Sequence, residues 1–191
     1  YNLTLHLLLA LLVFLYLIWL ALSMRKKPVP TDHPVAAKHI RWVLGIIVVQ
    51  IAFGGFMAGT KAGLLFQTWP LMNGTVIPPN AFHGANAMAA IFDNPTTINF
   101  VHRTLGILVF LAVGIFWLQN RRFSAPSMRR LEHALLLMVF LQFLLGVTTL
   151  LLASTHIPVF WGVVHQLGAF ILAGIATAIL YYARPRKPLI G

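Results

Sequence analysis

Three histidines lie within long apolar stretches of the sequence: His6, His102 and His165. A titratable side chain inside a stretch long enough to cross a membrane is a functional candidate by default, because burying it in hydrocarbon is unfavourable. Neutral imidazole binds metal ions through a ring nitrogen and is a common axial ligand of heme iron. The other five histidines lie at the ends of these stretches or between them and need no such explanation: His33, His39, His83, His133 and His156.

The three histidines share one depth. Each precedes an arginine by 19 residues, namely Arg25, Arg121 and Arg184. In a helix this interval corresponds to about 28 Å, nearly the thickness of a hydrocarbon core. If the arginines mark the inner membrane surface, all three imidazoles lie near the outer edge of the core. Two histidines from different helices at one depth match what a heme with two imidazole ligands requires, because helix bundles hold such cofactors between facing helices.

Small residues lie about one helical turn from each histidine: Ala10, Gly106, Gly162, Gly168 and Ala169. Residues three and four apart share a helix face, so each imidazole has room beside it. Such room serves either close packing of helices or a flat macrocycle. The chain has no cysteine and only three acidic residues. A zinc site, which needs more protein ligands, is therefore less well supported than heme.

Arg103 directly follows one of these histidines and is costly in the first turns of an apolar helix without an anionic partner. Heme propionates would be suitable bidentate partners. The alternative is that the side chain extends to lipid headgroups. Gln50 and Gln142 also lie inside apolar stretches, and we interpret them as making packing hydrogen bonds.

The elements that must position these residues are membrane helices. Hydrophobic residues make up 59% of the chain and charged residues 9%, against roughly 25% charged in soluble domains. We predict an all-α integral membrane protein with five transmembrane helices, the last four forming an antiparallel four-helix bundle around a heme over residues 42–183. The apolar stretches that are long enough to span lie near residues 3–24, 42–60, 98–118, 134–153 and 158–182.

Basic residues indicate the orientation. Twelve of the 14 Lys and Arg fall in the connections 25–41 and 119–133 or in the tail 184–191. The positive-inside rule then places the N-terminus outside and the C-terminus inside, with 25–41 as an inner loop. The same distribution accounts for the net charge of +11 without nucleic acid as a partner.

The outer segment 61–97 is long and rich in apolar residues, among them Trp69. A solvated loop would not carry so many, so we expect one or two short amphipathic helices against the membrane face. Ordered segments of this length are often lids over a site, and Trp69 would then contact the cofactor. The alternative is a plain interfacial anchor.

Four ordered strings resemble the heme A synthase family: QIAFGGFMAGTKAG at 50–63, QTWPLMNGTVIP at 67–78, IFDNPTTINFVHR at 91–103 and VHQ at 164–166. The resemblance covers essentially the whole chain. It implies eight membrane helices in two similar halves, each with a histidine pair on its second and fourth helices. His102 and His165 then become the iron ligands of the C-terminal half. Residues 1–24 match the last helix of the N-terminal half, so that His6 would ligate the heme iron of that half.

The resemblance implies heme A biosynthesis for cytochrome oxidase, by oxidation of the methyl group on carbon 8 of heme O to a formyl group. Heme b in the C-terminal half would transfer electrons, and heme O and heme A would be substrate and product. The family's N-terminal half carries an essential glutamate, whereas no predicted span of this chain contains one. We expect a longer protein or a partner chain to supply that half, and favour a fragment of a longer protein. No catalytic residue is assigned.

The partners implied are the lipid bilayer, the missing N-terminal half and heme O synthase, and a homo-oligomer stays open. The membrane is the bacterial inner membrane or, as the alternative, the mitochondrial inner membrane. Two other functions also stay open. A stand-alone membrane cytochrome b linked to quinol fits the histidines but not the strings QTWPLMNG and INFVHR. A heme-free interaction subunit leaves Arg103 and the shared depth of the histidines unexplained.

Overall fold

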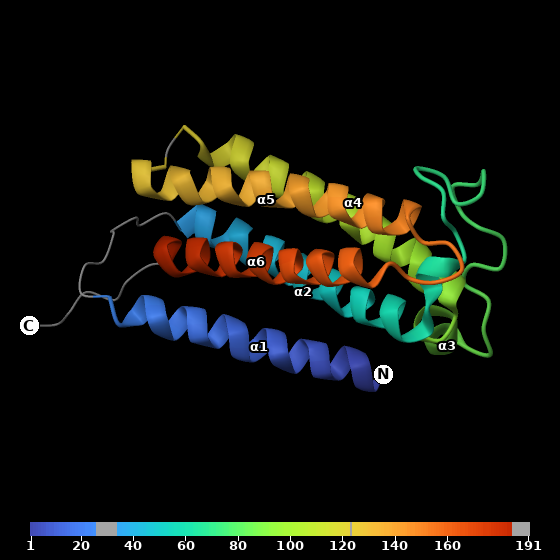
Figure 1. Cartoon of the computed structure of the whole chain (residues 1–191). Coiled ribbons are helices and arrows are strands. Elements are labelled where there is room, and N and C mark those ends of the chain that lie inside the picture. Colours follow the sequence, from blue (N-terminus) through green and yellow to red (C-terminus); the bar gives the residue numbers. More distant parts are fainter. Residues whose placement is uncertain (26–33, 123, 185–191) are drawn as a thin grey trace, which may run out of the picture.

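The computed structural model describes residues 1–25, 34–122 and 124–184, and over these residues the chain is helical with long parallel axes (Figure 1). Five helices in this part are long and apolar enough to cross a membrane, which confirms the predicted fold class. They are α1 (Asn2–Ser23), α2 (Pro34–Thr60), α4 (Pro95–Asn120), α5 (Pro126–Leu151) and α6 (Val159–Ala183). Two short elements, the 3₁₀ helix η1 (Ala62–Leu64) and α3 (Ala87–Phe92), lie between α2 and α4.

Two helices begin well before the apolar stretches that predict them. Helix α2 begins at Pro34 rather than at 42, and α5 begins at Pro126 rather than at 134. Their first turns carry charged residues, which a hydropathy criterion for hydrocarbon excludes although the backbone continues as a helix. The predicted inner loop 25–41 is therefore wrong from Pro34 onward, and residues 26–33 lie outside the described part of the chain.

Local sequence explains the start of α4. The Asn94 side chain accepts hydrogen bonds from the backbone N–H groups of Thr96 at 2.9 Å and Thr97 at 3.3 Å. Pro95 occupies the first helical position, where the missing N–H costs nothing because no intrahelical acceptor is available there. This firm start sets the register of the helix that carries His102.

Helices α2, α4, α5 and α6 form the predicted antiparallel bundle. Sequential neighbours pack against each other, and α2 closes the ring by packing on α6. Helices α4 and α6 therefore occupy opposite corners and run in the same direction (Figure 1). Residues at one depth on the interior faces of these two helices therefore lie across the same interior volume.

Helix α1 packs on the outside of this ring, against α2 and α6. Two glycines allow the close approach. A Cβ added at Gly55 would lie 2.9 Å from Cα of Thr4, and one added at Gly174 would lie 2.8 Å from Cδ1 of Ile18. A larger residue at Gly55 would meet the backbone of α1, so this glycine determines how closely α1 approaches α2, whereas at Gly174 the contact is the end of the Ile18 side chain, which can shift.

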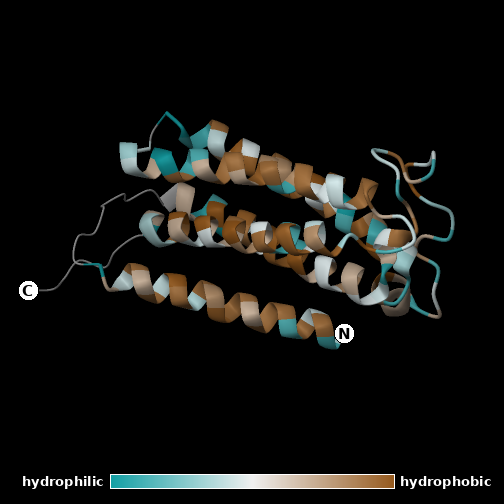
Figure 2. Ribbon diagram, in the orientation of Figure 1, coloured by the Kyte–Doolittle hydropathy of each residue, from teal (hydrophilic) through white to brown (hydrophobic). Residues whose placement is uncertain are grey.

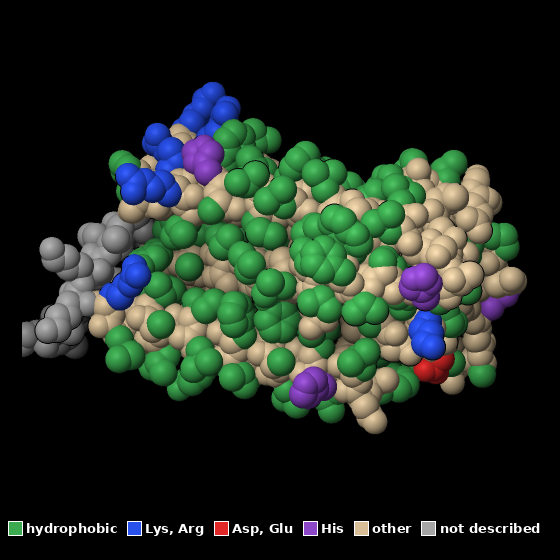
Figure 3. Space-filling view, in the orientation of Figure 1, with side chains coloured by type: hydrophobic (Ala, Val, Ile, Leu, Met, Phe, Trp, Pro, Cys, Tyr) green, Lys and Arg blue, Asp and Glu red, His purple; other side chains and the backbone are tan. Residues whose placement is uncertain are grey.

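The surface matches a membrane environment. Hydrophobic residues follow the lengths of the helices, and hydrophilic residues collect toward their ends (Figure 2). The face shown in Figure 3 has most of its Lys and Arg at the end of the bundle that carries the α4–α5 connection. The N-terminus lies at the opposite end, beside the segment between α2 and α4 (Figure 1). Four of the basic residues used to predict topology lie outside the described residues: Lys26, Lys27, Arg186 and Lys187.

The segment between α2 and α4 folds over one end of the bundle (Figure 1). It contains one short α-helix, α3, and the 3₁₀ turn η1. Side chains from the helices hold its backbone in place: the amide of Asn99 donates to the Ala62 carbonyl at 2.7 Å, and the hydroxyl of Thr97 accepts from the N–H of Phe82 at 2.8 Å. Gln67 donates to the Ser154 carbonyl at 2.7 Å, which ties the segment to the α5–α6 turn.

A histidine-lined cavity as the candidate functional site

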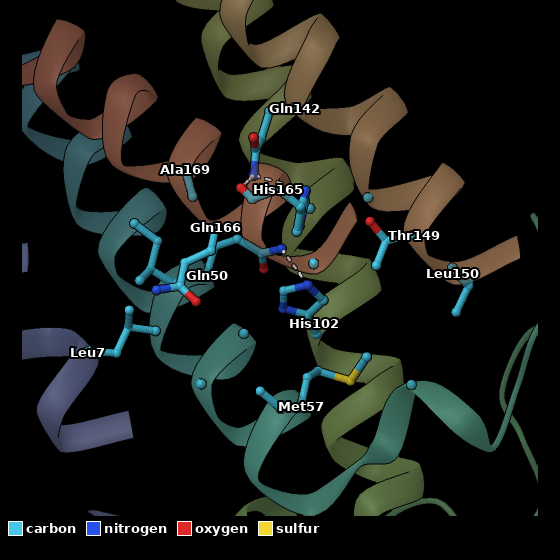
Figure 4. A pocket seen from close by; sticks show the side chains of 18 of the residues that line it. Leu7, Gln50, Met57, His102, Gln142, Thr149, Leu150, His165, Gln166 and Ala169 are labelled. Atoms are coloured by element: carbon cyan, nitrogen blue, oxygen red, sulfur yellow. Dashed lines mark hydrogen bonds between the residues drawn. The ribbon is translucent and has the colours of Figure 1, made fainter. Parts of the chain in front are cut away.

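A cavity of about 490 Å³ lies inside the bundle, within the usual size range of ligand sites. All four bundle helices contribute to its wall, and α1 and the outer segment complete it. The five residues selected from the sequence all line it: His6, Trp69, His102, Arg103 and His165. In Figure 4, His102 comes from α4 and His165 from α6, and both rings extend into the same space. The structure therefore brings the predicted pair together.

Each histidine of this pair meets a glutamine from the neighbouring helix (Figure 4). On α2, Nε2 of Gln50 lies 3.4 Å from Nε2 of His102. On α5, Nε2 of Gln142 lies 3.0 Å from Nδ1 of His165 and donates to the His165 carbonyl oxygen at 2.8 Å. The two glutamines do make hydrogen bonds, as interpreted, but their partners are the two histidines of the cavity.

Glycines make room for these contacts in the same way in both helix pairs. A Cβ added at Gly54, one turn after Gln50, would lie 3.4 Å from Cε1 of His102, and one added at Gly106 would lie 3.3 Å from Nε2 of Gln50. Each glycine thus lies opposite the polar side chain of the facing helix.

The α5–α6 pair repeats the arrangement more tightly. A Cβ added at Gly146, one turn after Gln142, would lie 3.0 Å from Cε1 of His165. One added at Gly168 would overlap the amide oxygen of Gln142. The recurring glutamine-x-x-x-glycine spacing, at 50 and 54 and again at 142 and 146, is a sequence signal that the histidine analysis missed.

Arg103 connects the cavity to the outer segment. Its Nε donates to Oδ1 of Asn99 at 2.7 Å, Nη1 to the Thr68 carbonyl at 2.8 Å and Nη2 to the Phe66 carbonyl at 2.5 Å. A guanidinium has five N–H donors, so these three bonds leave two donors for a further acceptor. The half-buried side chain is thus fixed by protein, an arrangement that sequence reasoning did not anticipate.

Trp69 follows immediately after the carbonyl that Arg103 holds. Its ring packs edge-on against Phe143 of α5, with 5.5 Å between ring centroids, and it lines the cavity. Trp69 therefore lies where the segment between α2 and α4 meets the cavity. His6 reaches the same cavity from α1 but is exposed. His83, His133 and His156 are also exposed and do not line the cavity, and His33 lies outside the described residues.

The donor set fits a heme better than a bare metal ion. Among the described residues no group of three or more His, Cys, Asp or Glu could hold a metal. Two histidines alone are too few for zinc, whereas heme iron has four ligands in its own ring and needs only axial ones. Within the described part of the chain, Nδ1 of His102 is buried and has no hydrogen-bond partner. Two imidazoles, an apolar cavity and glycines beside both rings fit this group.

The fold and the site define a multi-pass membrane protein with a histidine pair inside a four-helix bundle. Its membership is shown by the sequence: the chain belongs to the COX15-CtaA family of cytochrome oxidase assembly proteins, whose pattern matches residues 1–177.

Among similar curated proteins are the heme A synthases of three bacteria. That of Wolbachia sp. subsp. Brugia malayi is 38% identical over 98% of this chain and 54% of the relative. That of Nitrosomonas eutropha is 37% identical over 96% of this chain and 52% of the relative. That of Sinorhizobium medicae is 35% identical over 93% of this chain and 48% of the relative. The chain spans about half the length of these relatives. No solved structure matches the chain.

Proposed function

We propose that this chain is the electron-transfer half of a heme A synthase and binds one heme b between His102 and His165. The observation that carries the proposal is the placement of these two imidazoles, from opposite corners of the bundle, in one cavity. The similarity to heme A synthases supports the reaction, which is oxidation of the carbon 8 methyl group of heme O to the formyl group of heme A.

The residues of the chain would bind and orient the cofactor. His102 and His165 would hold the heme through their ring nitrogens, and the glycines beside them leave space that side chains would otherwise fill. Heme b held by two imidazoles supplies one-electron transfer. The free donors of Arg103 would meet a propionate while its other donors hold the outer segment closed.

The residues around the cavity would also shield the heme from water. Trp69 and the outer segment cover the end of the cavity that lies toward the outer surface. Restricted access of water to a heme is one of the factors that set its potential. We assign the segment the role of a lid for this reason, in preference to a plain interfacial anchor.

The catalytic half is proposed to lie in the remaining part of a protein of the relatives' length. His6 reaches the cavity from α1, which the resemblance assigns to that other half. In this proposal His6 ligates the heme of the catalytic half, at the boundary between the two. Heme O and heme A are the substrate and product there, and heme O synthase is the expected supplier of substrate.

The bacterial relatives support the bacterial inner membrane as the location. Five membrane-length helices imply the lipid bilayer as the first partner. A homo-oligomer is a further proposal that the geometry of this chain does not require.

A spectrum tests the function most directly. The chain would be expressed with its natural heme supply and purified in detergent, and its reduced-minus-oxidised difference spectrum recorded. We expect the sharp bands of a low-spin heme with two histidine ligands, and heme b on extraction.

Expression with a source of heme O distinguishes the proposal from a stand-alone cytochrome b. Binding of heme O or formation of heme A by the full-length protein supports it. A full-length protein that only exchanges electrons with quinol contradicts it.

A further inference from the structure

A cleft of about 230 Å³ lies at the end of the bundle that carries the α4–α5 connection. The chain just after α1, the first two turns of α5 and the last turn of α6 form its wall, through Arg25, Ser127, Met128, Leu131 and Tyr182. The cleft shares no residue with the histidine-lined cavity. A ligand bound here would therefore be independent of the proposed heme.

Contacts between α1 and α6 bring Arg25 to this cleft. The guanidinium of Arg184, at the end of α6, lies 4.6 Å from the ring centroid of Trp19 on α1 and 4.2 Å from that of Tyr181 on α6. The rings of Trp19 and Tyr181 meet edge-on, with 5.1 Å between their centroids. These contacts hold the end of α1 against α6, and Arg25 follows directly after that end of α1.

The cleft combines a polar rim with an apolar floor. Met128 is buried and Leu131 is partly buried, whereas Arg25 and Ser127 are exposed. In the part of the chain that the structure describes, the side chains of Arg25 and Ser127 have no hydrogen-bond or ionic partner. Ala125, the N-cap of α5, provides no side-chain cap for the first backbone N–H groups of that helix. An anionic group at the rim would therefore meet a guanidinium, a hydroxyl and uncapped N–H groups.

Positive charge dominates this end of the bundle. Of the described Lys and Arg, only Lys61 and Arg103 lie toward the opposite end. The acidic residue described at the basic end is Glu132, which is buried and accepts a hydrogen bond from the Ser124 hydroxyl. Within the described residues, the excess of positive charge is thus left for an anionic ligand to neutralise.

We propose that the cleft binds the headgroup of one anionic phospholipid, with the phosphate at Arg25 and Ser127 and the glycerol over Met128 and Leu131. The cleft lies at the ends of membrane-length helices, and basic sites between such helices bind anionic headgroups. Its volume is sufficient for a phosphate and the attached glycerol, so the acyl chains would continue along the apolar exterior of the bundle. The apolar floor favours a lipid over a soluble anion, which has no apolar part to bury.

The test measures how defined lipids bind to the purified full chain, by native mass spectrometry. Dioleoyl phosphatidylglycerol is anionic and dioleoyl phosphatidylcholine is zwitterionic, and because their acyl chains are identical the comparison isolates the headgroup. We expect one phosphatidylglycerol to bind each chain about fivefold more tightly than phosphatidylcholine, which is the contribution of one cation near an anionic headgroup.

Three variants that each lower the net charge by one unit locate the site. Arg25→Gln removes the cation from the rim, and Ser127→Asp places a carboxylate there. Arg122→Gln is the matched control, because Arg122 is exposed on the α4–α5 connection and does not line the cleft. We expect the first two variants to weaken phosphatidylglycerol binding by about fivefold or more, and the control to leave it unchanged. Ser127→Asp should keep the thermal stability of the chain, because an acidic residue is favourable in the first turn of a helix.

Each possible outcome supports or overturns the lipid site. Equal affinity for the two lipids would overturn it, because the cleft would then not recognise a headgroup charge. Equal weakening in all three variants would also overturn it, because it indicates a response to overall surface charge. If Arg25→Gln fails to fold, Ser127→Asp decides: weaker binding with unchanged thermal melting supports the site, and unchanged binding refutes it. These measurements do not require heme, so the lipid site and the proposed function can fail separately.

Discussion

The guanidinium of Arg103 donates to the backbone carbonyl of Phe66 at 2.5 Å, so a cavity residue of α4 directly holds the segment that covers the cavity. A second donor reaches the Thr68 carbonyl at 2.8 Å. The two bonds lie on either side of Gln67 and precede Trp69. The position of the cover is therefore linked to the side chain that we expect to meet a heme propionate.

Replacing Arg103 with lysine should loosen the outer segment without removing the positive charge. An ammonium group cannot reproduce the planar fork that reaches two carbonyls and Asn99 at once. Hydrogen bonds to charged groups contribute about 1.5–3 kcal/mol each, so local opening should become markedly more frequent. Faster hydrogen exchange at the amides of residues 67–69 would show this. Lys61→Gln, an exposed change at the same end, serves as the control, and equal exchange in both variants would count against the linkage.

Trp69→Ala should expose the heme rather than unfold the bundle. The indole packs on Phe143 of α5 and covers the cavity, while the segment itself is held by other contacts. We expect water to enter, the midpoint potential to shift and the low-spin spectrum to persist. Potentiometric titration and the rate at which a water-soluble oxidant reacts with the reduced heme measure these effects. An unchanged potential would favour the plain interfacial anchor.

Gly146→Ala should weaken heme binding, because its Cβ would lie 3.0 Å from Cε1 of His165 and force the ring to move. Gly114→Ala is the matched control within α4, where an added Cβ meets nothing within 4 Å. The control should be neutral or stabilise the helix by about 0.5–1 kcal/mol. Heme retention and thermal melting would be measured for both. Equal heme retention in the two variants would show that heme binding by His165 does not depend on the space beside Gly146.

The membrane helices and the shared depth of His102 and His165 could be predicted from sequence, because the thickness of the hydrocarbon core constrains both the length of a helix and the depth of a residue within it. A membrane helix must be apolar over a fixed length, and its depth can be read from flanking arginines such as Arg121. The start of α2 at Pro34 could not be predicted this way, because its polar first turns lie beyond the hydrocarbon edge. The contacts of Gln142 and Arg103 depend on how helices rotate against each other, which periodicity alone does not determine.

The orientation in the membrane can be tested with single cysteines, because the chain contains none. Ser127 at the start of α5 and Ser154 in the α5–α6 turn are both exposed and lie at opposite ends of the bundle. In intact cells, cysteine at position 154 should react with an impermeant thiol reagent, and cysteine at 127 should react only after the membrane is permeabilised. The reverse labelling pattern would invert the topology.

The last prediction concerns the ligands of the heme. His102 and His165 lie at opposite corners of the bundle, line one cavity and have glycines that leave space for their rings. Replacing either with alanine should abolish the spectrum of a low-spin heme with two histidine ligands or convert it to high spin. His133→Ala, an exposed change near the α4–α5 connection, should leave the spectrum intact. His6→Ala is the critical comparison, because His6 also lines the cavity but is exposed on α1. We expect it to spare this heme, since its proposed role belongs to the other half of the enzyme. If His6→Ala lost the spectrum while His165→Ala kept it, the ligand pair would span α1 and α4 instead of α4 and α6.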